Sequence, residues 1–119
     1  MKENVVKDKS FNFAVRIVKL NQYLVKRKRE FVLSKQILRS GTAVGALVRE
    51  SEQAESTADF IHKLSIALKE ANETDYWLDL LYKTDYLEEK QHQSLKNDSA
   101  ELLRLLTAII KTSKRKGEN

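Results

Sequence analysis

Residues 32–51, VLSKQILRSGTAVGALVRES, decide the fold of this chain. At about 100° of rotation per residue, one face of a helix collects its larger apolar side chains and one serine: Leu33, Ile37, Ser40, Val44, Leu47 and Val48. Gly41, Ala43, Gly45 and Ala46 have almost no side chain. A glycine inside a helix costs roughly 1 kcal/mol relative to alanine. The two glycines therefore predict that another helix packs closely against this backbone.

The same periodicity predicts three further helices, so that the four expected helices span residues 10–27, 32–51, 57–82 and 90–113. We expect Ser10 to cap the first helix. Ser56 and Asp59 have capping-box spacing at the third, with Asp in place of Glu or Gln. The chain has no proline and three glycines, so little interrupts these segments. Short connections predict an all-α, up-down-up-down antiparallel four-helix bundle. We expect one domain over residues 1–119, with 1–9 and 114–119 as flexible tails.

The first predicted helix has more apolar surface than one member of a bundle buries. Its two adjacent apolar stripes together cover an arc of about 220°. The third predicted helix also has a second stripe, rimmed with acidic residues. We expect these surplus stripes to meet between copies of the chain, through Phe11, Val15 and Val18 of one copy and Ile66, Trp77 and Leu80 of its neighbour. Arg16 and Lys19 would then face Glu70 and Glu73. The alternative is a wide contact inside the core.

The charges are sorted along the chain. Residues 1–49 contain twelve Lys and Arg against three acidic residues, a net charge of +9. Residues 50–101 contain five Lys against thirteen acidic residues, a net charge of −8, and residues 102–119 have a net charge of +4. Such sorting favours either a basic surface for a polyanion or complementary faces that meet on assembly.

The strongest basic cluster is predicted at one pole of the bundle. Glu30 is the only acid expected nearby, and Tyr23, one turn back, is placed to stack on a base. Phosphate backbones bind such clusters by releasing counterions, without sequence readout. We therefore expect nucleic-acid contacts from Lys26, Arg27, Lys28, Arg29, Lys35 and Arg39. Two alternatives remain: the charges keep the protein in solution, or they pair with the acidic third helix of a neighbouring copy.

The sequence contains no recognisable catalytic motif, so we expect no enzyme activity, no cofactor and no metal. There is no cysteine, which excludes thiolate chemistry. His62 and His92 lack metal-ligand spacing and are expected at the surface. We expect Glu70 and Glu73 on a solvated or salt-bridged face, and Asp75, near the core, to pair with Arg39. The absence of a signal peptide or a membrane-spanning run predicts a cytoplasmic protein that does not bind membranes.

Residues 36–50, QILRSGTAVGALVRE, resemble the second-helix signature of a bacterial four-helix-bundle family. That signature is Gln-Leu-x-Arg-Ala-x-x-Ser-Ile-x-x-Asn-Ile-x-Glu. Residues 59–71, DFIHKLSIALKEA, and 73–78, ETDYWL, resemble its third-helix signature. The family comprises proteins encoded in intervening sequences of bacterial large-subunit ribosomal RNA genes, often labelled ribosomal-protein-like. Accessory variability determinant proteins of diversity-generating retroelements are its relatives. By position, Arg39 and Glu50 match the signature Arg and Glu, whereas Ala43 and Leu47 replace the signature Ser and Asn.

This resemblance implies a homopentameric ring of four-helix bundles. In the retroelement relatives, it implies a positively charged surface that binds nucleic acid and a reverse transcriptase. Together with the charge sorting, it predicts a non-catalytic, homo-oligomeric, pentameric protein that binds RNA or DNA. The alternative is an interaction scaffold that docks an acidic or polymerase-like protein partner.

Overall fold

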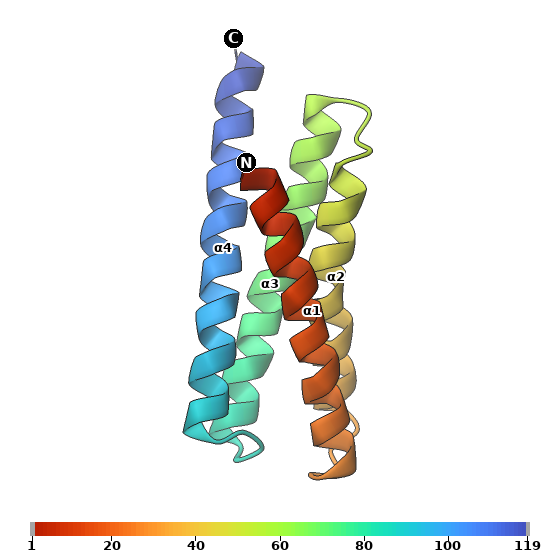
Figure 1. The fold of residues 1–119 in the computed structure, drawn as a ribbon, viewed down its shortest axis with the longest axis vertical. Helices are drawn as coiled ribbons and strands as arrows, with labels where there is room; N and C mark the ends of the chain where they lie inside the picture. The colour runs from red at the N-terminus through yellow and green to blue at the C-terminus, as the bar shows by residue number, and fades with distance from the viewer. Residues whose placement is uncertain (1, 119) are drawn as a thin grey trace.

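The computed structural model describes residues 2–118, and four helices account for most of them: α1 (Lys2–Lys26), α2 (Leu33–Ser51), α3 (Thr57–Lys83) and α4 (Glu89–Glu118). Consecutive helices run in opposite directions along a rod of 51 × 22 × 19 Å (Figure 1). The described residues contain no strand. These findings confirm the prediction of an all-α, four-helix fold.

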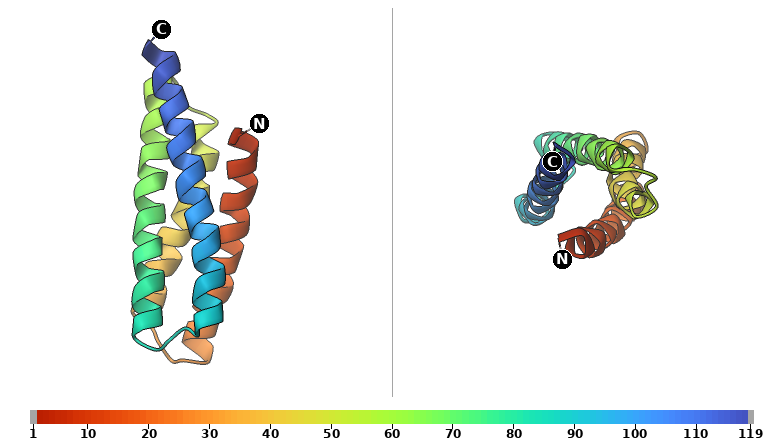
Figure 2. Two further views of the ribbon diagram at one scale, coloured as in Figure 1. Left: turned by 90° about the vertical axis from the view of Figure 1, so that its left-hand side faces the viewer. Right: turned by 90° about the horizontal axis from the view of Figure 1, so that it is seen from above.

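Each helix packs against its neighbours in the chain, and α1 and α4 close the bundle (Figure 2). The contact between α1 and α4 is the smallest of the four. Two ion pairs span it, from Lys9 Nζ to Glu101 at 3.0 Å and from Arg16 to Asp98 at 2.7 Å. Because exposed ion pairs contribute little, the stability of the bundle rests on its shared apolar core.

The glycines of α2 allow α1 to approach its backbone, as predicted. A Cβ at Gly41 would lie 2.8 Å from Cγ1 and Cγ2 of Ile17, whose side chain is fully buried. A Cβ at Gly45 would lie 3.2 Å from the carbonyl oxygen of Ser10. Contacts this short require the neighbouring helix to move, so glycine determines the distance between α1 and α2.

The predicted starting point of the first helix is wrong. Ser10 does not cap α1, because the helix begins at Lys2 and Ser10 lies inside it. The Ser10 side chain is buried, and its hydroxyl donates to the carbonyl of Lys7 at 3.1 Å. Val6, only 1% exposed, extends the buried stripe of Phe13 and Ile17 toward the N-terminus. Residues 2–9 are thus part of α1, and α4 likewise continues beyond Ser113. Residues 1 and 119 of the predicted tails lie outside the described residues.

Both ends of α3 have defined capping. The Ser56 hydroxyl accepts from the Asp59 N–H at 3.0 Å, which confirms the predicted N-cap. At the other end, the Asp85 N–H donates to the Tyr82 carbonyl at 3.1 Å and the Tyr86 N–H to the Leu81 carbonyl at 2.9 Å. This is a Schellman motif, with Asp85 in the left-handed conformation at φ 69°.

A polar network joins α3 to α4 and corrects two predictions. Asp75 pairs with Lys96 at 2.7 Å and accepts from the Ser99 hydroxyl at 2.9 Å, so its partner is not Arg39. His92 is not simply a surface residue: its side chain is 16% exposed, and Nε2 lies 2.8 Å from Asp79 Oδ1. His62 is exposed, as expected.

The same network affects the titration of Asp79. Burial raises the pKa of Asp79, but hydrogen bonds from His92 and Lys96 outweigh it and hold that pKa below its ordinary value.

Candidate nucleic-acid interface

The turn between α1 and α2, residues 27–32, has a well-defined backbone. The Arg27 N–H donates to the Tyr23 carbonyl at 2.8 Å, and the Glu30 N–H reaches the Leu24 carbonyl at 3.0 Å. Arg29 has φ 55°, in the left-handed region that few residues other than glycine adopt. This conformation reverses the chain and directs Glu30 toward the start of α2.

Glu30 is the buried anchor of this turn, with only 8% of its surface exposed. Its carboxylate accepts hydrogen bonds from the backbone N–H groups of Val32, Leu33 and Ser34, at 3.2, 3.0 and 2.7 Å. Burial raises the pKa of Glu30, but these backbone hydrogen bonds outweigh it, so the pKa lies below its ordinary value. The carboxylate thus caps α2 and is withdrawn from the surface of the turn.

The cations of the turn remain at the surface. Lys26, Arg27, Lys28, Arg29 and Lys35 are all exposed. Within residues 2–118, none of these five forms an ion pair with an acidic side chain. The structure therefore brings together five of the six predicted nucleic-acid-binding residues at this connection: Arg27, Lys28 and Arg29 on the turn itself, Lys26 at the end of α1 and Lys35 in the first turn of α2. We call these five residues the basic turn.

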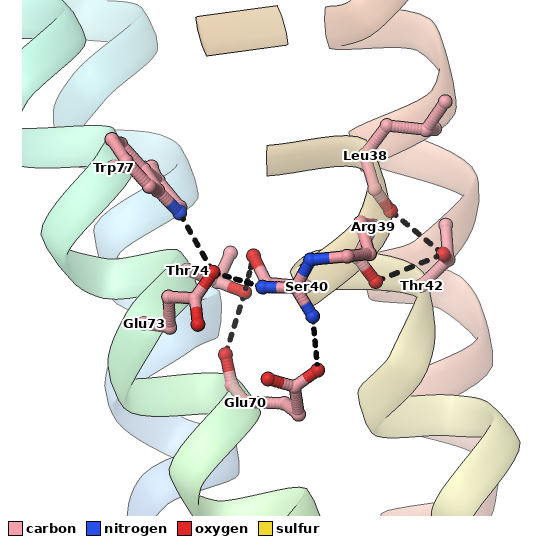
Figure 3. A network of polar contacts seen from close by, with 8 residues as sticks. All are labelled: Leu38, Arg39, Ser40, Thr42, Glu70, Glu73, Thr74 and Trp77. Carbon is pink, nitrogen blue, oxygen red and sulfur yellow. Dashed lines mark hydrogen bonds and ion pairs between the residues drawn. The ribbon is translucent and has the colours of Figure 1, made fainter. Parts of the chain in front are cut away.

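Arg39 is the sixth predicted nucleic-acid-binding residue, but its charge is paired with two glutamates of α3. Its guanidinium joins α2 to α3 by donating to Glu70 at 2.7 Å and also to Glu73 (Figure 3). Glu73 in turn accepts from the indole N–H of Trp77 at 3.0 Å. The bond from Trp77 contributes most to lowering the pKa of Glu73, followed by Arg39, although burial opposes both. The predicted salt-bridged face at Glu70 and Glu73 is thus present, within a single chain.

Three further side chains lie at or near the turn, and one of them, Tyr23, was expected to be placed to stack on a base. Tyr23 packs against the core and is only partly exposed. Phe31 and Val32 instead face solvent, with exposed fractions of 55% and 69%. The signal in the sequence was an apolar pair that follows the four cations and Glu30, at the start of the second predicted helix, where neither helical stripe includes it.

The end of the bundle with the basic turn also contains acidic residues. The turn between α3 and α4 lies at the same end (Figures 1 and 2). It exposes Asp85, Glu88 and Glu89 alongside Lys83 and Lys90. The expectation that Glu30 is the only nearby acid is therefore wrong, and the positive charge belongs to one turn rather than to the whole pole.

The residues predicted at the contact between copies lie on two helices. Phe11, Val15 and Val18 of α1 are 53%, 39% and 39% exposed. Ile66, Trp77 and Leu80 of α3 are half-buried. Arg16, Glu70 and Glu73, the expected charged rim, already have partners in their own chain. The apolar side chains of α1 are thus available for a contact and those of α3 are partly available, whereas most of the predicted ionic pairing is not.

Residues 2–118 contain neither a cluster of metal ligands nor a membrane-spanning helix. No group of three or more His, Cys, Asp or Glu side chains there could hold a metal ion. No helix of this part of the chain has the length and apolar character needed to cross a bilayer. The molecule is thus a small four-helix bundle with an exposed basic turn at one end.

Comparison with known proteins identifies the family. The chain belongs to the 23S rRNA-intervening sequence protein family, whose model matches residues 2–108. It is similar to a protein with unknown function from the S23 ribosomal protein family of Bacteroides thetaiotaomicron, known from a crystal structure. The two are 64% identical, with a TM-score of 0.92, over 93% of this chain and 99% of that chain. No curated protein matches the chain.

Proposed function

We propose that this protein is a non-catalytic, cytoplasmic nucleic-acid-binding protein that contacts RNA or DNA phosphates through the basic turn. One observation supports the proposal most: five exposed cations lie together without acidic partners among the described residues, while Glu30 is turned inward. A cation that is already paired with a carboxylate gains little binding free energy from a phosphate. An unpaired cation can neutralise a phosphate and release the counterions of the polyanion. Arg39 is left out of the contact because its charge is shared with Glu70 and Glu73.

A titration with labelled RNA and DNA tests this proposal. Each neutralised phosphate contributes about −0.9 to the slope of log affinity against log salt for duplex DNA, and about −0.7 for single strands. We expect a steep slope in fluorescence anisotropy between about 50 and 200 mM salt. Changing Lys26, Arg27, Lys28 and Arg29 together to Gln should flatten it and weaken binding by at least tenfold.

The matched control removes the same charge from the other end of the bundle. Lys111, Lys114, Arg115 and Lys116 are exposed on the last turns of α4. Changing these four to Gln gives the same net charge as the turn variant. We expect the control to bind almost like the wild type. Equal losses in both variants would show that net charge alone attracts the nucleic acid, and would overturn the assignment to the basic turn.

We further propose that the protein is a homo-oligomer, a pentamer as the family resemblance implies. The apolar side chains of α1 and α3 support this assembly, because large exposed apolar surface commonly marks an interface. Sedimentation analysis of Phe11→Glu and Trp77→Glu should show a smaller mass than the wild type. His62→Glu, at an exposed position on α3, serves as the control. An unchanged mass in both apolar variants would overturn the proposed contact.

The second candidate is a scaffold that docks an acidic or polymerase-like protein. The same exposed residues Phe11, Val15 and Val18 favour it, because protein partners bury apolar surface in addition to charge. Heparin should displace a nucleic acid bound through phosphates, whereas a protein partner held by apolar contacts should remain bound. No nucleic-acid binding at low salt would favour the scaffold.

A further inference from the structure

Phe31 and Val32 expose large apolar side chains next to the cations of the basic turn. Their exposed fractions of 55% and 69% are high for apolar residues in the described part of the chain. Leu33, the next residue, packs against the core. Between α1 and α2, the outward placement of apolar side chains is thus limited to these two positions.

The backbone holds this arrangement on both sides of Phe31. Before it, Glu30 is buried, and its carboxylate accepts from the N–H groups of Val32, Leu33 and Ser34. After it, the Ser34 hydroxyl donates to the Glu30 carbonyl at 2.8 Å, and the Asn21 amide donates to the Ser34 carbonyl at 3.0 Å. The aromatic ring is therefore presented by an ordered turn, which lowers the entropic cost of binding.

We propose that Phe31 is a stacking platform for an unpaired base, so that the ligand of the basic turn is single-stranded nucleic acid rather than duplex. The inference rests on the proposed function and deepens it. An aromatic ring beside cations that hold phosphates is the arrangement by which proteins bind single strands without sequence preference. Bases in a duplex are already stacked on each other and cannot use the ring.

The rest of this end of the bundle favours a narrow ligand over a membrane. An anionic bilayer would cover the whole 22 × 19 Å end of the rod. It would meet Asp85, Glu88 and Glu89 of the neighbouring turn as well as the basic turn. A single strand can follow the basic turn alone and leave these carboxylates in water.

The test compares an RNA of about 12 nucleotides with a blunt duplex of the same length by fluorescence anisotropy. The wild type should prefer the single strand. Phe31→Ala should weaken single-strand binding about tenfold or more, leave duplex binding within about twofold, and leave the salt slope unchanged, because stacking involves no counterions. Phe31→Tyr should retain binding, whereas Phe31→Leu should not, which separates stacking from simple apolar contact.

Val32→Ala is the matched control at the adjacent exposed position, and it should bind within about twofold of the wild type. Phe31→Trp adds a spectroscopic signature, because its fluorescence should be quenched by a stacked base. The wild type, which contains one tryptophan, provides the baseline.

The outcomes separate this inference from the proposed function. If the variant with Gln at positions 26–29 loses binding but Phe31→Ala does not, the basic turn binds nucleic acid and the stacking role is wrong. If the wild type binds neither RNA nor DNA, both proposals fail. Binding to vesicles rich in phosphatidylserine that depends on Phe31, without nucleic-acid binding, would overturn both in favour of a membrane. A changed assembly mass in Phe31→Ala would also overturn the stacking role.

Discussion

The two turns at one end of the bundle share one backbone feature and have opposite arrangements of side chains. Each contains a residue other than glycine in the left-handed region, Arg29 at φ 55° and Asp85 at φ 69°. After Asp85 the chain buries Leu87, which is 4% exposed. After Arg29 it buries an acid, Glu30, and exposes Phe31. The α3–α4 turn thus contributes to the core, whereas the α1–α2 turn keeps apolar surface in water, where it adds nothing to folding stability.

The largest expected difference between the turns concerns their apolar residues. Leu87→Ala should lower the free energy of unfolding by about 2–3 kcal/mol, because it leaves a cavity against the core. Phe31→Ala should change it by no more than about 0.5 kcal/mol. Urea unfolding followed by circular dichroism measures both. Similar losses in the two variants would mean that Phe31 packs in the folded protein and that the two turns are alike.

The start of each following helix gives the next largest difference. Glu30 satisfies three N–H groups of α2, whereas Gln91 at the start of α4 accepts only from the Glu88 N–H, at 2.9 Å. Glu30→Ala should therefore cost about 2 kcal/mol, and Gln91→Ala about 0.5 kcal/mol. The same urea titration checks this ranking. A larger loss for Gln91→Ala would show that Glu30 is not the anchor of its turn.

Acid should act on the α1–α2 turn through Glu30. The folded-state pKa of Glu30 lies below its ordinary value of 4.5. Its stabilisation is therefore complete above that value and is lost as the pH falls through the folded-state pKa. Between about pH 6 and pH 3, Glu30→Gln should lose less stability than the wild type. The lowered pKa values of Glu73 and Asp79 are present in both proteins, so some acid sensitivity should remain. Identical pH profiles would contradict this role of Glu30.

The smallest expected effect is shared by the two turns. Arg29→Gly and Asp85→Gly should each raise the free energy of unfolding by about 0.5 kcal/mol, because glycine adopts the left-handed conformation without a steric cost but loses more entropy on folding. Thermal unfolding detects such a shift. Only Arg29→Gly should also weaken RNA binding in the anisotropy titration. A loss of binding in Asp85→Gly would extend the interface to the second turn.

The helices were predictable because periodicity is a local property of the sequence. The stripes of α2, the close approach at Gly41 and the cap at Ser56 all follow from spacing and residue type. The predicted start of α1 was too late in the chain, because Ser10 is a good capping residue although Val6 and Phe13 already have helical spacing. That spacing continues the buried stripe toward the N-terminus.

Pairings between distant residues were harder to predict than the helices. Asp75 lies near the core, where a carboxylate needs a partner, and Arg39 was the expected cation. The closer cation proved to be Lys96, on a helix whose rotation the sequence does not specify. The cations of the basic turn were predicted from their order in the sequence and the antiparallel topology. The inward direction of Glu30 and the outward direction of Phe31 depend instead on one left-handed residue. No local rule assigns that conformation to an arginine.

Glu30 has a further consequence for how the turn can hold an anion. The start of a helix is an anion site, because its free N–H groups point outward along a favourable dipole. In α2, three of these groups are occupied by the chain's own carboxylate. A phosphate at this turn therefore meets only long, rotatable Lys and Arg side chains instead of a rigid cradle of backbone amides. Contacts through such flexible side chains do not fix which phosphate is bound. They would let the protein slide along a strand from one phosphate to the next.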